Sequence, residues 1–332
     1  MSELALPTRE NVLAAAERIA PVVLETPVVS RSSLNESLGF EVFFKCENLQ
    51  RTGSFKFRGA SNAVARLVSS LDGGPRPVVT THSSGNHGAA LALAASQAGL
   101  ESEIVVPRGA NPLKRAAVAR YGGRVRDCGE TLAEREATLE DVVRERGACF
   151  IPPYDHPDIV AGQGTAALEL AASVSDLDQV WVPVGGGGLA GGSLLAFSES
   201  PTVVRGVEPE LADDASWSLV KGEIQPQKPP VTIADGLRTA LGRIPFQLFQ
   251  QHGLRISTVS EDEIIAAQVM LWQRLKLVVE PSGAVPLAGL LAASRADPEA
   301  FRGSRHGVIL SGGNALFAAA GGQSVGSDSQ IR

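Results

Sequence analysis

A lysine stands between two aromatic residues in Phe55-Lys56-Phe57. Desolvation by such neighbours disfavours the ammonium form, so it lowers the pKa of the lysine and frees an amine that can attack an aldehyde. Far downstream, four consecutive glycines, Gly185 to Gly188, follow an apolar strand. Their bare backbone N–H groups suit a phosphate. Because pyridoxal phosphate carries both an aldehyde and a phosphate, the two segments together predict a site for that cofactor.

The glycine run also permits a second interpretation. With Leu189 and Ala190 it fits the dinucleotide pattern G-x-G-x-x-A, and Glu208 lies at about the distance of the acidic residue that meets a ribose hydroxyl. This nicotinamide alternative explains neither Lys56 nor the polar segment 83–87. A non-catalytic amino-acid-binding protein is a third alternative, and the presence of Lys56 counts against it.

The composition limits the function classes. The chain has 332 residues, of which 44% are hydrophobic, enough for one large or two medium domains. Its net charge is −6, and the 30 basic and 36 acidic residues are interleaved, so there is no basic footprint for nucleic acid or an anionic membrane. The three cysteines have no paired spacing, which argues against a disulfide framework or a zinc site. Without a signal peptide or an apolar run of membrane length, the chain is predicted to be cytoplasmic.

Strands and helices are predicted to alternate along almost the whole chain. The predicted strands are 41–47, 77–81, 103–106, 124–127, 149–151, 179–184, 202–207 and 307–310. The predicted helices are 12–20, 87–98, 112–121, 132–146, 162–172, 189–198, 261–275 and 282–293. This order predicts parallel sheets with helices on both faces. Ligands bind such sheets at the carboxyl ends of the strands, and three polar or glycine-rich segments, 83–87, 185–188 and 311–314, each follow a predicted strand.

The chain is predicted to form two domains. A glycine-rich patch at 71–77 and a turn at 151–156 bracket a small inserted domain, residues 76–150, within a large domain made of residues 1–70 and 154–320. The polar tail, residues 321–332, is predicted to be disordered.

Six motifs carry a resemblance to a known family. They are Glu47-Asn48-Leu49-Gln50-Arg51-Thr52-Gly53-Ser54-Phe55-Lys56, Ser83-Ser84-Gly85-Asn86-His87-Gly88, Ala161-Gly162-Gln163-Gly164-Thr165, Gly185 to Gly188, Glu280-Pro281-Ser282-Gly283 and Ser311-Gly312-Gly313-Asn314. In this order they resemble the serine/threonine dehydratase and serine racemase family, pyridoxal-phosphate enzymes of fold type II. The resemblance implies an α/β fold like that of tryptophan synthase β, in which two parallel-sheet, three-layer domains hold the cofactor in the cleft between them. It also implies a homodimer.

The resemblance implies a role for individual residues. Lys56 would form the Schiff base and remove the Cα proton of the substrate. The implied cofactor contacts are Lys56, Phe55, Asn86, Gly185, Gly186, Gly187, Gly188, Leu189, Glu280 and Ser311. The implied substrate contacts are Ser83, Ser84, Asn86, His87, Arg135 and Thr239. A neutral Ser311 hydroxyl at the pyridine nitrogen would favour elimination.

An acidic loop after the strand 202–207 resembles the divalent-cation loop of the same family. Its ligands would be Glu208, the carbonyl of Ala212, and Asp214. All-oxygen ligation suits magnesium or calcium, and the ion would act structurally. A solvated acidic loop without an ion is the alternative.

The predicted reaction is that of an ammonia-lyase for β-hydroxy amino acids. After loss of the Cα proton, L-serine or L-threonine would expel water and yield a 2-oxo acid and ammonia. The chain ends soon after Asn314, which leaves no room for the regulatory domain of feedback-controlled threonine deaminases and favours a catabolic or racemase-type enzyme. Serine racemisation, with Lys56 and Ser84 as acid and base on opposite faces, is one alternative. L-threo-3-hydroxyaspartate dehydration is the other.

Overall fold

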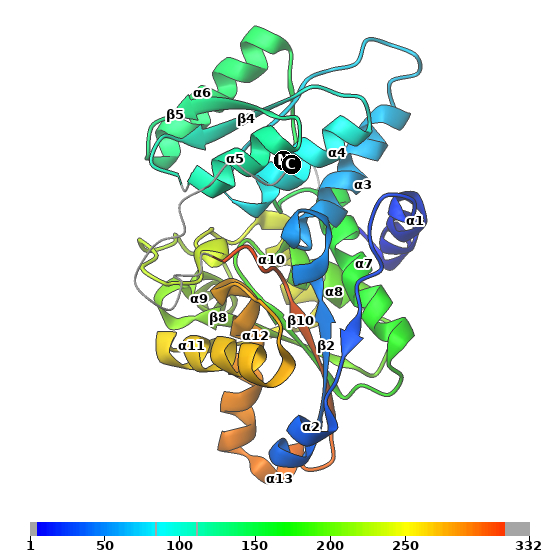
Figure 1. Cartoon of the computed structure of the whole chain (residues 1–332), viewed down its shortest axis with the longest axis vertical. Helices are drawn as coiled ribbons and strands as arrows, with labels where there is room; N and C mark the ends of the chain where they lie inside the picture. The colour runs from blue at the N-terminus through cyan, green and yellow to red at the C-terminus, as the bar shows by residue number, and fades with distance from the viewer. Residues whose placement is uncertain (1–4, 84, 111, 316–332) are drawn as a thin grey trace.

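Two sheets organise the protein in the computed structural model, which describes residues 5–83, 85–110 and 112–315 (Figure 1). The larger, six-stranded sheet has the order β1-β2-β10-β7-β8-β9, and the smaller, four-stranded sheet the order β5-β4-β3-β6. Neighbouring strands run parallel except β1 and β2, which are antiparallel. The strands are β1 (Val28–Val29), β2 (Glu41–Cys46), β3 (Val79–His82), β4 (Ser102–Pro107), β5 (Arg124–Cys128), β6 (Cys149–Phe150), β7 (Gln179–Pro183), β8 (Val203–Pro209), β9 (Arg255–Val259) and β10 (Arg305–Leu310). The predicted fold class is confirmed.

Helices cover both sheets. They are α1 (Arg9–Ile19), α2 (Ser32–Leu38), α3 (Lys56–Ser69), α4 (Asn86–Gln97), α5 (Pro112–Arg120), α6 (Leu132–Arg146), α7 (Pro157–Ser173), α8 (Gly188–Ala196), α9 (Asp214–Lys221), α10 (Arg243–His252), α11 (Glu261–Met270), α12 (Pro281–Ala296) and α13 (Pro298–Phe301). Short 3₁₀ turns lie at η1 (Glu47–Leu49), η2 (Arg51–Gly53), η3 (Glu210–Ala212) and η4 (Asp235–Leu237). The predicted helix 261–275 ends as α-helix at Met270 and continues as the π-helical turn η5 (Leu271–Leu275).

Alternate residues of the central strands feed two different core layers, as the pleat of a strand requires. In β7, Val180 and Val182 pack with Leu170 of α7 and Leu194 of α8, whereas Trp181 packs on the opposite side with α12. Strands of a parallel sheet that is buried on both faces are therefore apolar at successive positions, which is why the sequence signals them as short apolar runs.

The smaller sheet is covered in the same way. Ile104 and Val106 of β4 pack with α3 and α4, while Val105 between them packs with Leu139 and Val142 of α6. The strands of this sheet lie between residues 79 and 150. The predicted domain boundaries stay a prediction, and the predicted disordered tail lies outside the described residues.

Helix α3 was not predicted from the sequence. It begins at Lys56, and its first eight residues after Lys56, from Phe57 to Val64, are all buried. Its buried half includes the polar residues Arg58, Ser61 and Asn62, which a sequence pattern does not signal as core positions. In Figure 1 α3 rises from the lower part of the molecule to lie beside α4 in the upper part, and it packs against α7 and α4. Across the described part of the chain, no helix is long and apolar enough to cross a membrane.

Candidate active site

The candidate site is formed where the strands of both sheets end. The glycine run follows the carboxyl end of β7, Ser311 follows β10, and the segment leading to Asn86 follows β3. Parallel α/β sheets bind ligands at such ends. Lys56, at the start of α3, completes the site.

Lys56 is half-buried beside two aromatic rings. Its Nζ lies 5.1 Å from the centre of the Phe55 ring and 5.9 Å from that of Tyr154, and it donates a hydrogen bond to the carbonyl of Pro153 at 2.8 Å. Burial lowers the pKa of Lys56 to about 8, and the negative charge of Glu280 acts in the opposite direction. An amine with this pKa is partly free at neutral pH and mostly free above pH 8, where an ordinary lysine is still protonated.

The glycine run forms a tight backbone cradle at the start of α8. Gly187, the N-cap, has φ of 87°, a conformation that favours glycine, and it has no side chain to cap the helix. A Cβ on Gly186 would lie 2.4 Å from the ring of Tyr154, so this position has room only for glycine. The first N–H groups of α8 have no partner within the helix and carry its positive dipole end, which suits a phosphate.

Two predicted contacts adjoin this cradle. The Gly186 N–H donates to the Thr239 hydroxyl at 2.9 Å, so the structure places Thr239, predicted to contact substrate, against the cradle itself. Leu189 is buried and packs into the core beneath α8 rather than into the cleft. Its contribution to a ligand is therefore confined to its backbone N–H.

Asn86, Glu280, Asn314 and Ser311 form the wall nearest the start of α3. Asn86 donates through Nδ2 to Glu280 Oε1 at 2.8 Å and accepts at Oδ1 from Asn314 Nδ2 at 2.9 Å. Glu280 is buried, and burial raises its pKa to about 7; its Oε2 has no hydrogen-bond partner among the described residues. The Ser311 carbonyl accepts from the Phe55 N–H at 3.0 Å, which ties this wall to the lysine segment.

The polar segment after β3 leads into α4. The Ser83 hydroxyl accepts from the Gly85 N–H at 3.3 Å, and Ser84 lies outside the described residues. His87 is buried with Nε2 3.1 Å from the carbonyl of Ile151, and burial lowers its pKa to about 3. This neutral imidazole cannot act as a cation for a carboxylate, but the N–H groups of the first turn of α4 can still bind one.

Arg135 lies in the first turn of α6, at the carboxyl edge of the smaller sheet. Its Nη2 donates to the Glu130 carbonyl at 2.8 Å, while its Nε is buried and has no hydrogen-bond partner within the described part of the chain. The pKa of His82, the last residue of β3, is lowered first by burial and further by the positive charge of Arg135. The guanidinium thus lies near enough to the end of β3 to act on His82, and its buried Nε is a donor without a partner among the described residues.

Comparison with known proteins assigns the family. The family model described as "Pyridoxal-phosphate dependent enzyme" matches residues 19–312. The chain belongs to this family. It is 44% identical over 311 residues to β-hydroxyaspartate dehydratase of Paracoccus denitrificans, covering 93% of this chain and 96% of that protein. It is 43% identical over 312 residues to L-threo-3-hydroxyaspartate ammonia-lyase of Saccharomyces cerevisiae, covering 93% and 94%. The crystal structure of serine racemase from Dictyostelium discoideum superposes with a TM-score of 0.87 at 41% identity, covering 94% of this chain and 100% of that one.

The chain is thus a pyridoxal-phosphate dependent enzyme of fold type II, and its site fits the cofactor. A half-buried amine of lowered pKa and a cradle that a single Cβ would fill are the two features that an aldehyde and a phosphate need. The nicotinamide interpretation is not supported, because the family match is to another cofactor and Glu208 is fully buried with both carboxylate oxygens accepting from backbone N–H groups.

The predicted cation loop contains two buried carboxylates. Glu208 accepts from the N–H groups of Ala215 and Ser216, and Asp214 accepts from Leu241 N–H at 2.9 Å. Burial is the main cause that raises the pKa of both carboxyls. No three His, Cys, Asp or Glu side chains within the described ranges are grouped to hold a metal, so an ion here would depend on these two carboxylates and the Ala212 carbonyl. Both carboxyls are thus held by backbone N–H donors and raised in pKa mainly by burial, and the predicted ion stays a prediction.

Tyr154 and Pro153 are site residues to which the sequence reasoning gave no firm role. The ring of Tyr154 lies between the Lys56 amine and Gly186, and the Pro153 carbonyl accepts from that amine. The signal was the Pro-Pro-Tyr segment that directly follows the predicted strand 149–151. A turn of this kind at a carboxyl strand end is a candidate site position whatever its composition.

Proposed function

We propose that this enzyme is an ammonia-lyase for β-hydroxy amino acids, with L-threo-3-hydroxyaspartate as its preferred substrate and L-serine and L-threonine as weaker ones. The sequence alone predicted serine or threonine. Two considerations favour the dicarboxylate. Relatives at 42 to 44% identity are named β-hydroxyaspartate dehydratase or L-threo-3-hydroxyaspartate ammonia-lyase, and the buried Nε of Arg135, near the end of β3, has no hydrogen-bond partner among the described residues. The second observation carries the proposal.

Lys56 would hold the cofactor aldehyde and take the Cα proton. When bound, pyridoxal phosphate supplies the electron sink that makes this proton acidic. The low pKa of the Lys56 amine suits proton transfer close to physiological pH, because a base is most effective when its pKa lies near the working pH. The protonated amine is then in place to assist departure of the β-hydroxyl as water.

The remaining residues would hold the cofactor by its different edges. The N–H groups of Gly185, Gly187, Gly188 and Leu189 would bind the phosphate, and Gly186, whose N–H donates to Thr239, would shape the backbone of the cradle. Phe55 would pack against the ring, Asn86 would donate to its phenolic oxygen, and Ser311 would face its nitrogen, with Glu280 holding Asn86 in place. Asn86 is supported in this role because both ends of its amide are fixed by neighbours.

The substrate would be held by both of its ends. The first turn of α4 and the side chains of Ser83, Ser84 and Asn86 would bind the α-carboxylate, and the N–H of His87 would take part. Arg135 would bind the β-carboxylate of 3-hydroxyaspartate through its free Nε and a second guanidinium nitrogen, a paired geometry that a hydroxyl or methyl group cannot offer. Thr239 would orient the cradle.

Serine racemisation is the second candidate function. It is favoured by the serine at position 84 in the loop after β3, and by relatives of 41 to 44% identity that are named serine racemase. Ser84 would return a proton to the face of the substrate opposite Lys56. Loss of D-serine formation in Ser84→Ala, with elimination largely kept, is the expected result for this role; equal loss of both would contradict it.

Three further features belong to the proposal. A magnesium or calcium ion bound by Glu208, the Ala212 carbonyl and Asp214 would neutralise the buried carboxylates. The chain would fold as a large domain of residues 1–70 and 154–320 and a small domain of residues 76–150. The enzyme would be a cytoplasmic homodimer.

A substrate panel tests the proposed function. Purified enzyme loaded with pyridoxal phosphate is incubated with L-threo-3-hydroxyaspartate, L-serine or L-threonine, and 2-oxo acids, ammonia and amino-acid enantiomers are quantified by chiral chromatography. We expect oxo acid and ammonia in equal amounts, formed most efficiently from 3-hydroxyaspartate. Highest kcat/KM with L-serine or L-threonine would overturn the substrate assignment, and D-serine as the dominant product would establish the racemase.

A further inference from the structure

The motif Ala161-Gly162-Gln163-Gly164-Thr165 lies in the first half of α7, where every one of these residues is buried. None of them reaches the proposed substrate or cofactor contacts. Helix α7 packs most extensively against α8 and α3, and Figure 1 shows it beside them. These two neighbours begin at the two ends of the cofactor site, since Lys56 opens α3 and the glycine cradle opens α8.

One side of the motif contacts the start of α3. A Cβ on Gly162 would lie 2.6 Å from the Gly59 Cα and 2.9 Å from the Arg58 carbonyl, so the two helix backbones touch. The Gln163 side chain, which is fully buried, accepts through Oε1 from the Gly59 N–H at 3.1 Å. Gly59 is the fourth residue of α3, within the turn whose N–H groups lack partners in an ordinary helix start. Gln163 therefore completes the first turn of the helix that carries Lys56.

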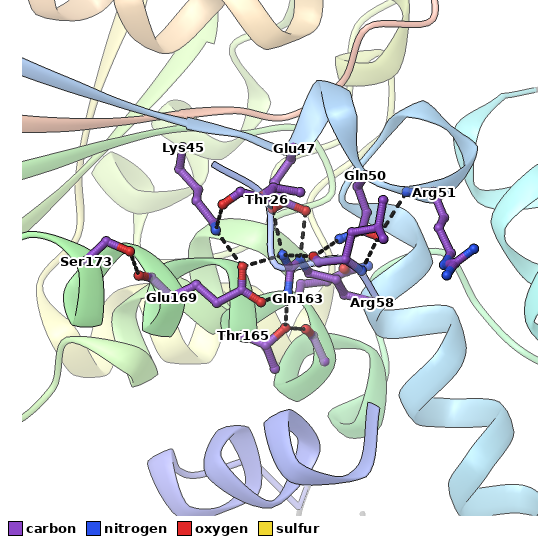
Figure 2. A network of polar contacts seen from close by, with 12 residues as sticks. Thr26, Lys45, Glu47, Gln50, Arg51, Arg58, Gln163, Thr165, Glu169 and Ser173 are labelled. Atoms are coloured by element: carbon purple, nitrogen blue, oxygen red, sulfur yellow. Dashed lines mark hydrogen bonds and ion pairs between the residues drawn. The ribbon is translucent and has the colours of Figure 1, made fainter. Parts of the chain in front are cut away.

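A buried charge network strengthens this contact (Figure 2). Arg58, two residues after Lys56, donates to Thr165 Oγ1 at 3.2 Å and to Glu169 Oε1 at 2.6 Å, both on α7. On its other side Arg58 donates through Nε to Glu47 Oε2 at 2.7 Å. The guanidinium fork thus fixes the first turn of α3 to α7 and to η1, directly after β2, in one orientation.

The other side of the motif contacts α8. A Cβ on Gly164 would lie 2.6 Å from the Gly192 carbonyl oxygen. In return, a Cβ on Gly192 would lie 2.4 Å from the Val160 carbonyl and 2.5 Å from the Gly164 nitrogen. The backbones of α7 and α8 are therefore in direct contact at Gly164 and Gly192, with no side chain between them. Unlike a side chain, a helix backbone cannot change rotamer to make room for an added Cβ.

We propose that residues 162–165 of α7 are a positioning element that sets the spacing between the Lys56 amine and the phosphate cradle. The inference rests on the proposed roles of Lys56 and the glycines. A ligand held at two points gains from the second point only when the spacing of the anchors matches its own length. Gly162 and Gln163 fix the position of α3, which carries the Lys56 amine, and Gly164 fixes the position of α8, which follows the phosphate cradle. Because all three residues belong to one rigid helix, α7 defines the distance between the amine and the cradle.

The test compares two aldehydes with one structural difference. Apo-enzyme is titrated with pyridoxal phosphate and with pyridoxal, which has the same aldehyde and no phosphate, and binding is followed by the visible absorption of the ligand. In the unmodified protein the phosphate compound binds far more tightly, because both anchors act together. In Gly162→Ala and Gly164→Ala this preference is expected to fall at least about tenfold, since a shift of the order of 1 Å removes much of the benefit of a second anchor. In Gln163→Met, which keeps the volume and leaves the Gly59 N–H unpaired, a smaller fall of roughly threefold is expected.

Gly289→Ala is the matched control. Gly289 lies in α12, and a Cβ there would come within 2.5 Å of a Val207 methyl, so this variant also crowds a helix that is buried in the core. It should lower the melting temperature to a similar extent and leave the preference for the phosphate compound unchanged. If Gly162→Ala or Gly164→Ala fails to fold, Gln163→Met carries the test.

The result that would overturn the positioning role of α7 differs from the result that would overturn the proposed cofactor contacts. An unchanged preference in all the α7 variants, accompanied by the same loss of thermal stability as in Gly289→Ala, would show that the motif is merely structural. A lack of any phosphate preference in the unmodified protein, or an unaltered aldehyde reaction in Lys56→Ala, would instead overturn the proposed cofactor contacts.

Discussion

The cofactor side and the substrate side of the proposed site differ in whether backbone or side-chain atoms form them. The cofactor side is mostly backbone: Gly186 and Gly187 have no room for a Cβ, and the helices behind them touch through glycines. The proposed substrate side combines the backbone N–H groups of α4 with side chains that have a buried polar atom without a partner among the described residues, the Nε of Arg135 and the Nδ1 of His87. Packed backbone admits few substitutions, whereas a half-used side chain can be exchanged at little structural cost. The cofactor side should therefore respond to mutation by losing the cofactor, and the substrate side by changing its substrate.

Replacing Lys56 removes the one group that serves both sides. Lys56→Ala is expected to reduce kcat by at least roughly 10⁴-fold for every substrate, because the variant lacks both the covalent anchor and the base. Its visible spectrum should also lose the band of the covalently held cofactor. Measurement of turnover and of the absorption spectrum checks both. Activity with 3-hydroxyaspartate that survives while activity with serine is lost would show that Lys56 serves only part of the site.

The substrate side is tested at Arg135. Arg135→Met is expected to lower kcat/KM for L-threo-3-hydroxyaspartate by roughly 10²–10⁴-fold, because a site built to pair a polar group rejects a partner it can no longer match. For L-serine the change should stay within about fivefold, since serine has no second carboxylate to lose. Steady-state kinetics on both substrates measures the ratio. Arg135→Lys is the control: it keeps the charge without the fork and should fall between the two. Equal losses on both substrates would place Arg135 outside substrate selection.

The cofactor side is tested at Gly186. A Cβ there would lie 2.4 Å from the Tyr154 ring, which in turn contacts Lys56, so Gly186→Ala must displace the cradle or the ring. We expect affinity for pyridoxal phosphate to fall roughly 10²-fold, with the ratio of activities on 3-hydroxyaspartate and serine unchanged. Gly191→Ala, in the first turn of α8, is the matched variant. Its Cβ would lie 3.2 Å from a Leu248 methyl and no closer than that to any other neighbour, so it should bind nearly normally. A changed substrate ratio in Gly186→Ala would mean that the two sides are not separable.

This contrast also explains what the sequence could predict. The cofactor side can be predicted from the sequence, because the glycine run and the lysine between aromatic residues are local patterns whose chemistry follows from residue type. The alternation of strands and helices likewise follows from short apolar runs. Helix α3 was missed because its buried half contains polar residues, Arg58 and Asn62 among them, whose partners lie far along the chain in α7. The unpaired state of Arg135 and the role of Gln163 in completing α3 depend on contacts between distant segments, and no local pattern encodes them.

A cation at Glu208 and Asp214 should affect stability rather than either side of the site. Removal by a chelator is expected to lower the melting temperature by about 5 °C, since a ligand present at about a hundred times its Kd contributes close to 3 kcal/mol. Scanning calorimetry before and after addition of magnesium or calcium measures the shift. Glu208→Gln should abolish it, whereas Glu210→Gln, at an exposed neighbouring carboxylate, should not. A melting temperature that is indifferent to chelator and to both ions would leave the acidic loop without an ion.

The smallest expected effect concerns the electrostatic link from Glu280 to Lys56. Because the pKa of Lys56 is about 8, the reaction of apo-enzyme with pyridoxal should accelerate as pH rises through 8, where an ordinary lysine would still be protonated. Glu280, with a pKa of about 7, is mostly ionised at that pH, and its negative charge favours the ammonium form of Lys56. In Glu280→Gln this charge is absent while an oxygen remains to accept from Asn86. The midpoint should therefore move below that of the unmodified protein.

Stopped-flow rates of pyridoxal binding from pH 6 to 10 measure the pH midpoint of the unmodified protein and that of Glu280→Gln. Because pyridoxal itself titrates in the same way in both experiments, its titration does not affect the difference between the two midpoints. Asn314→Ala serves as the control, because it removes a neighbour of Asn86 and leaves the charge of Glu280 in place. Its midpoint should stay near that of the unmodified protein. A midpoint that does not move in Glu280→Gln would mean that Glu280 is protonated and carries no charge in the functional pH range. The wall around Asn86 would then act as a hydrogen-bond donor, not as an anion facing the Lys56 amine.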